Sequence, residues 1–108
     1  MSFKVELAES FKKHAKRLLK KYPSLKTEIA NLIFSLETNP AQGTDLGNNC
    51  YKIRLAIKSK QKGKSSGARV ISYVTIIKET VILLTIYDKS DRENISDEEL
   101  ENLIKQIL

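Results

Sequence analysis

Hydrophobic residues recur along this chain with two different periods, and the change between them divides the sequence. Residues 11–22 and 25–36 place apolar side chains three or four positions apart, which predicts two amphipathic helices. The stripes are Phe11, Ala15, Leu18, Leu19 and Tyr22, then Leu25, Ile29, Leu32, Ile33 and Leu36. Pro23 cannot continue a helix, so we expect the first helix to end before it. Ser24 is then an N-cap candidate, and the short joint predicts a helical hairpin.

From residue 51 the period becomes two, which predicts strands. One face of the first strand carries Tyr51, Ile53, Leu55 and Ile57, and the other carries Lys52, Arg54, Ala56 and Lys58. Residues 69–77 are expected to return alongside it, after a loop at 60–67 that contains two glycines. Residues 81–87 are apolar on both faces, which is typical of an interior strand.

The two ends of the chain complete the predicted fold. Residues 4–7 alternate like a short opening strand. Ser96 and Glu99 have the spacing of a capping box, so a final helix is expected over 97–108. The order β-α-α-β-β-β-α predicts an α+β fold, with the helical hairpin and the C-terminal helix packed on a mostly antiparallel four-stranded sheet. A length of 108 residues fits one domain, 1–108.

Composition excludes several classes of protein. The longest apolar run, 81–87, is far shorter than the ~20 residues of a membrane span. No signal-peptide core follows Met1, so we expect a cytoplasmic protein without a membrane partner. Cys50 and His14 are the single cysteine and the single histidine, which argues against a disulfide framework and against a zinc site. We therefore expect no metal and no cofactor.

Positive charge is concentrated in the first two thirds of the sequence. Residues 1–70 have a formal charge of +10 and residues 71–108 have −4, giving the net +6. No acidic residue lies between Asp45 and Glu79, an interval that contains eight Lys and Arg residues. A basic surface of this extent favours a polyanionic partner such as RNA. The alternative is a solvated lysine-rich loop that only aids solubility.

The strongest candidate site is a group of cations on the predicted sheet. Lys52 and Arg54 share one strand face, Arg69 begins the next strand, and Lys89 and Arg92 follow the last strand. Such a group would bind a phosphodiester and stabilise the extra charge of its transition state. The alternative is an edge strand whose solvent-facing lysines prevent aggregation.

Other reactive residue types have simpler interpretations. His14 falls at the border between the apolar stripe and the lysine face of its helix, where a surface or boundary histidine is a better interpretation than a catalytic one. Cys50 is expected to be buried and inert. Asp88 and Asp91 fit turn or cap residues better than a metal pair, and Tyr73 and Tyr87 fit the core.

Three segments carry a resemblance to a known family. They are LGNNCYKIR at 46–54, GARVISYV at 67–74 and LLTIYDK at 83–89. With the preceding helical hairpin, they resemble toxins of the RelE/ParE superfamily, from bacterial type II toxin–antitoxin systems. The resemblance covers nearly the whole chain and is strongest to the RelE/HigB-like branch.

This resemblance implies a metal-independent endoribonuclease that cleaves mRNA in the ribosomal A site. A 2′-OH would attack the adjacent phosphate and leave a 2′,3′-cyclic phosphate and a 5′-OH end. Carried over by position, phosphate and transition-state contacts fall on Arg54 and Arg69, and proton transfer falls on Lys52 and Lys89. Some relatives use a tyrosine or histidine after the last strand. This chain has neither there, so Tyr87 is the nearest substitute.

Further basic residues are candidates for binding RNA or the ribosome: Lys58, Lys60, Lys62, Lys64 and Arg92. For the loop lysines, a role limited to solubility is an equal alternative. The expected partners are mRNA, ribosomal RNA and a cognate antitoxin. The antitoxin should carry an acidic or amphipathic segment that covers the basic surface or displaces the helix at 97–108.

Two other functions fit the same fold. One is a ParE-like inhibitor of DNA gyrase that cuts no RNA, against which the basic residues argue. The other is a non-catalytic RNA-binding relative.

Overall fold

Eight regular elements and one 3₁₀ turn make up the protein in the computed structural model, which describes residues 2–60, 66–92 and 94–108. In chain order they are β1 (Lys4–Leu7), α1 (Glu9–Lys21), α2 (Leu25–Thr38), β2 (Thr44–Gly47), β3 (Cys50–Leu55), the 3₁₀ turn η1 (Lys58–Lys60), β4 (Ala68–Thr75), β5 (Thr80–Asp88) and α3 (Asp97–Ile107). The predicted α+β class and element types are confirmed.

The sheet has the strand order β1-β5-β4-β3-β2, with β1 parallel to β5 and all other pairs antiparallel. As predicted, β5 is an interior strand. The expected count of four strands was wrong, because β2 pairs with β3 as a fifth. Asn48 and Asn49 join this pair, with φ values of 54° and 64°. A two-residue turn with both φ values positive matches the right-handed twist of a hairpin, and asparagine tolerates that conformation.

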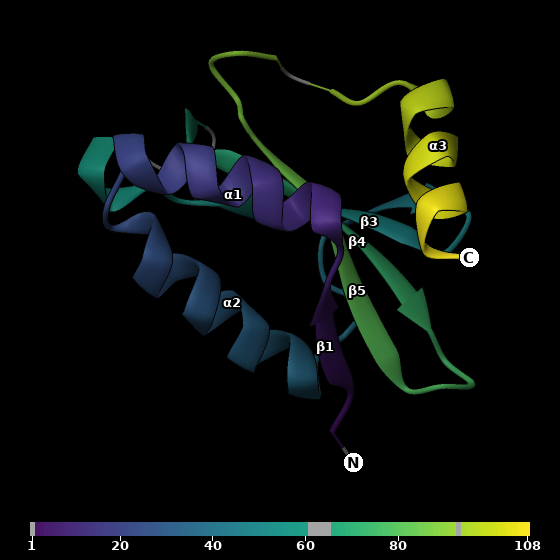
Figure 1. The fold of residues 1–108 in the computed structure, drawn as a ribbon. Helices are drawn as coiled ribbons and strands as arrows, with labels where there is room; N and C mark the ends of the chain where they lie inside the picture. Colours follow the sequence, from purple (N-terminus) through teal and green to yellow (C-terminus); the bar gives the residue numbers. More distant parts are fainter. Residues whose placement is uncertain (1, 61–65, 93) are drawn as a thin grey trace.

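Helices cover both faces of the sheet (Figure 1). Between the sheet and the α1–α2 pair lies the larger core, in which Phe11, Leu25 and Leu36 are almost completely buried. On the opposite face, Leu100 and Leu103 of α3 pack over Cys50, Ile71 and Leu84. No helix within the described residues is both long and apolar enough to span a membrane.

Both predicted caps lie at helix starts, but only one acts as a cap. The Ser96 side chain accepts a hydrogen bond from the Glu99 N–H at 3.1 Å. Ser24 precedes α2 in helical conformation, and its hydroxyl accepts instead from the Ser59 N–H at 3.0 Å and the Ser59 hydroxyl at 2.7 Å. Beside it, buried Glu28 accepts from the Lys58 N–H at 2.7 Å.

These contacts fix the segment that follows β3 against the start of α2. The alternating pattern predicted a strand through residue 58, whereas β3 ends at Leu55. Ile57 is nevertheless fully buried in the larger core. Tertiary anchoring by Glu28 therefore replaces strand pairing here.

Candidate active site

Four side chains lie near one another on the sheet face that also carries α3, and three of them are paired across neighbouring strands. Arg54 of β3 pairs with Arg69 of β4, and Arg69 pairs with Tyr87 of β5. Directly opposed residues on neighbouring strands place their Cβ atoms about 5 Å apart. Lys52 lies two residues from Arg54 and so on the same face. We call Lys52, Arg54, Arg69 and Tyr87 the basic row.

The side chains of the basic row on β3 are more exposed than those on β4 and β5. Arg54 is exposed and Lys52 is half-buried, whereas Arg69 is 3% and Tyr87 7% exposed. One guanidinium nitrogen of Arg69, Nη1, donates to the Ala68 carbonyl at 3.1 Å. A ligand that approaches from solvent would therefore meet Arg54 and Lys52 first.

The segment between β5 and α3 contacts the row at two points. Lys52 Nζ donates to Asn94 Oδ1 at 2.9 Å. The Arg92 guanidinium lies 4.5 Å from the centroid of the Tyr87 ring and forms two hydrogen bonds to the Glu99 carboxylate, at 2.6 and 2.9 Å. Because Glu99 belongs to the first turn of α3, this ion pair attaches α3 to the basic row.

Burial raises the pKa of the Tyr87 hydroxyl, while the charges of Arg92 and Arg69 oppose the shift. The hydroxyl therefore stays protonated at neutral pH. A protonated phenol can donate a hydrogen bond to a phosphate or a proton to a leaving oxygen.

Asp88, at the end of β5, is 1% exposed and belongs to a hydrogen-bonded turn. Its Oδ2 accepts from the Tyr22 hydroxyl at 2.9 Å, and its Oδ1 accepts from the Ser90 N–H at 3.0 Å and the Ser90 hydroxyl at 2.7 Å. The predicted turn role of Asp88 is confirmed. This carboxylate also links the α1–α2 joint to the segment that carries Arg92.

The remaining predicted residues are less closely associated with the row. Within the described residues, no hydrogen bond or ion pair joins the Lys89 ammonium to it, and the Lys89 N–H donates to the Gly67 carbonyl at 3.0 Å. Lys58 is exposed at the start of η1. Lys62 and Lys64, and the side chain of Lys60, lie outside what the structure describes.

Cys50 is completely buried, and burial raises the pKa of its thiol to about 11. Its predicted burial is confirmed, and a thiol with so high a pKa is a poor nucleophile at neutral pH. In the described parts of the chain, no group of three or more His, Cys, Asp or Glu side chains is placed to bind a metal ion.

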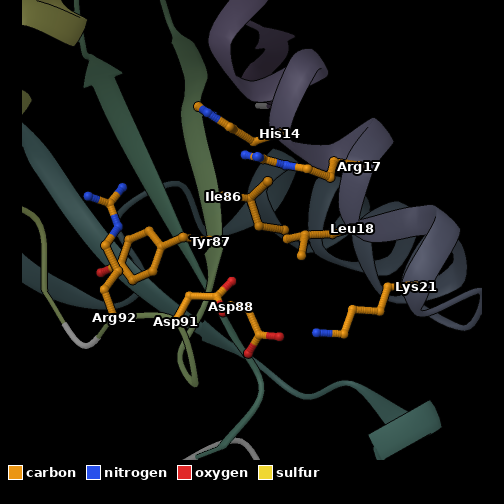
Figure 2. Close-up of a pocket in the computed structure, with 9 residues that line it drawn as sticks. All are labelled: His14, Arg17, Leu18, Lys21, Ile86, Tyr87, Asp88, Asp91 and Arg92. Carbon is orange, nitrogen blue, oxygen red and sulfur yellow. The ribbon is translucent and has the colours of Figure 1, made fainter.

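A pocket of about 450 Å³ lies between α1 and the end of β5, next to the basic row (Figure 2). Its α1 wall includes His14, Arg17 and Lys21, and Tyr87 and Arg92 form part of the other side. Sequence reasoning missed this wall. Positions 14, 17 and 21 are three and four residues apart, so helical spacing could have placed them on one side of α1.

His14 is half-buried, and its Nδ1 lies 3.0 Å from the Thr85 hydroxyl of β5. Burial lowers the pKa of the imidazole, and the charges of Arg17 and Lys13 lower it further. The ring is therefore neutral at physiological pH. The predicted boundary position is confirmed, and in addition the ring lines the pocket.

The family model described as "RelE toxin of RelE / RelB toxin-antitoxin system" matches residues 4–107. The chain belongs to the RelE toxin family. No protein with a curated description matches it in sequence.

Solved structures of RelE toxins have the same fold. A double mutant of the E. coli toxin RelE in the free state superimposes with a TM-score of 0.62 at 20% identity, covering 100% of both chains. The RelBE2 toxin–antitoxin complex of Mycobacterium tuberculosis gives 0.60 at 13% identity, covering 82% of this chain and 99% of the other. Isolated E. coli RelE gives 0.54 at 18% identity, covering 99% of this chain and 100% of the other.

Proposed function

We propose that this RelE-family toxin is an endoribonuclease that cleaves mRNA on translating ribosomes. The observation that carries the proposal is the basic row, in which two arginines and a tyrosine are opposed across three strands, with a lysine beside them. Family membership supports the toxin role, and the row supports phosphodiester chemistry.

In the proposed reaction the 2′-oxygen forms a bond to phosphorus as the P–O5′ bond breaks. The 2′-hydroxyl loses its proton to a base, the 5′-oxygen leaves with the bonding electrons and gains a proton, and the products are a 2′,3′-cyclic phosphate and a 5′-OH. Arg54 and Arg69 would stabilise the negative charge that builds up on the phosphate oxygens. Lys52 is the candidate base, with Lys89 as the alternative. Tyr87 is the candidate acid, because burial keeps its hydroxyl protonated.

Arg54→Ala tests the site with little risk to the fold, because Arg54 is exposed. In a purified translation system we expect it to slow mRNA cleavage by about 10²-fold or more, since a charge contact made in the transition state is lost. Lys78→Ala is the matched control, because Lys78 is also exposed but lies at the β4–β5 turn. Full activity of Arg54→Ala would refute the assigned site.

We also infer that the partner is an antitoxin with an acidic or amphipathic segment that covers the basic row or displaces α3. The +10 charge of residues 1–70 supports an acidic partner, and the similar M. tuberculosis structure is a toxin–antitoxin complex. Co-expression with the product of the adjacent gene should restore growth, and the two proteins should co-purify. Harmless expression of this chain alone would argue against its role as a toxin and therefore against the need for an antitoxin.

A further inference from the structure

The pocket beside the basic row has an open cationic wall. Arg17 lines it from α1, and within the described residues Arg17 forms no hydrogen bond or ion pair. Figure 2 shows its side chain extending from the helix towards β5, on the same side as His14. Lys21 adds a second exposed cation one helical turn further on.

Two acidic residues, Asp88 and Asp91, also line the pocket. Asp88 is buried, and its two carboxylate oxygens accept hydrogen bonds from Tyr22 and Ser90. Both carboxylates attract the Lys21 ammonium. Because Arg92 is paired with Glu99, Arg17 is the cation of the described lining that remains available to an incoming anion.

The pocket also offers flat and apolar surfaces. The imidazole of His14 and the guanidinium groups of Arg17 and Arg92 are planar, and Leu18 and Ile86 line the pocket between them. Unpaired RNA bases stack on histidine rings and on guanidinium planes. A volume of about 450 Å³ is within the range of small-ligand sites.

We propose that this pocket binds one unpaired nucleotide of the RNA substrate, with its base against His14 and its phosphate facing Arg17. The nucleotide would be a neighbour of the scissile phosphate, because Tyr87 and Arg92 belong to both the pocket and the surroundings of the basic row. The inference rests on the proposed RNA substrate. It adds residues of α1 to the surface that would bind this RNA.

Binding of a 2′-O-methyl hexaribonucleotide tests the proposal, because this probe has no 2′-OH and cannot be cleaved. The titration is followed by NMR on the full chain, with inorganic phosphate in a parallel titration. We expect signals of His14, Arg17 and Tyr87 to shift together and to saturate. Arg17→Ala should weaken binding about fivefold or more. Lys16→Ala is the matched control, since it removes the same charge from the next position of the same helix, and it should change the affinity less than twofold.

Three results would overturn the proposal. The first is a change of NMR signals confined to Lys52 and Arg54. The second is an equal loss of RNA affinity in Arg17→Ala and Lys16→Ala. The third is that inorganic phosphate alone gives the same signal changes and the same affinity. The proposed function fails by a different measurement, namely the absence of RNA cleavage by the wild-type protein. If RNA binds in the pocket but is not cleaved, the pocket proposal holds and the nuclease proposal fails. If RNA is cleaved but does not bind in the pocket, the nuclease proposal holds and the pocket proposal fails.

Discussion

At the scale of single residues, the site depends on side chains that hold other side chains. Within the described residues Glu99 forms no hydrogen bond to the basic row, but its carboxylate fixes the Arg92 guanidinium over the Tyr87 ring. The hydrogen bonds from Arg92 are the largest cause of a lowered pKa for Glu99. A lowered carboxyl pKa means that ionisation of this group stabilises the folded protein.

Glu99→Gln should therefore lower the free energy of unfolding in a pH-dependent manner. The loss should be about 1 kcal/mol or less at pH 7, because the pair is partly exposed. The stabilisation by Glu99 is present above its ordinary pKa of about 4.3 and is lost as pH falls through the lower folded value. Urea unfolding at pH 7 and at pH 3 measures this, and an equal loss at both values would contradict the assignment.

Burial is the main cause of the lowered pKa of His14, and the charge of Arg17 should add to it. NMR titration of the single histidine should give a pKa below the ordinary 6.5. Arg17→Ala should raise this pKa, because removing a nearby positive charge favours the protonated ring. An unchanged pKa in Arg17→Ala would show that the two side chains do not interact across the pocket wall.

At the scale of elements, the periodicity of the sequence predicted the helices and the interior strand. It did not predict strand β2, which depends on the conformation of a turn. The stripes of α1 and α2, the Ser96 cap and the interior position of β5 follow from local patterns. Strand β2 has only four residues and no apolar alternation, so its pairing depends on the Asn48–Asn49 turn. The close approach of two backbone segments is a second feature that the sequence did not predict.

Gly67 illustrates such an approach, because a Cβ at this position would lie 2.1 Å from the Leu55 carbonyl oxygen. Gly67→Ala should force the backbone apart just before β4 and cost about 1–3 kcal/mol of unfolding free energy. It should also weaken the hydrogen bond that the Gly67 carbonyl accepts from Lys89.

Gly47→Ala is the comparison for this prediction. Gly47 has φ +81°, but a Cβ added there would have no atom within 4 Å, so the cost should come from backbone conformation alone, about 1 kcal/mol. Urea denaturation of both variants provides the test. A Gly67→Ala protein as stable as wild type would mean that the β3–β4 approach is looser than described.

At the scale of the whole molecule, the sheet separates two surfaces with different roles. The α1–α2 face holds the larger core, and the α3 face holds a smaller core beside the basic row. The distribution of charge predicted a basic site. It did not predict that Arg69 and Tyr87 are buried, because their burial depends on packing between segments far apart in the sequence. The pocket was missed for the same reason, since it joins α1 to β5, which lie far apart in the sequence.

The central claim is cleavage of mRNA during translation, and 5′-end mapping by primer extension tests it most directly. A reporter mRNA is incubated with the purified protein, once with active translation and once without. We predict cuts within codons only when ribosomes translate the message. Cuts of equal strength in free RNA would contradict ribosome dependence, and an intact message under both conditions, with trapped gyrase–DNA complexes instead, would contradict the nuclease itself.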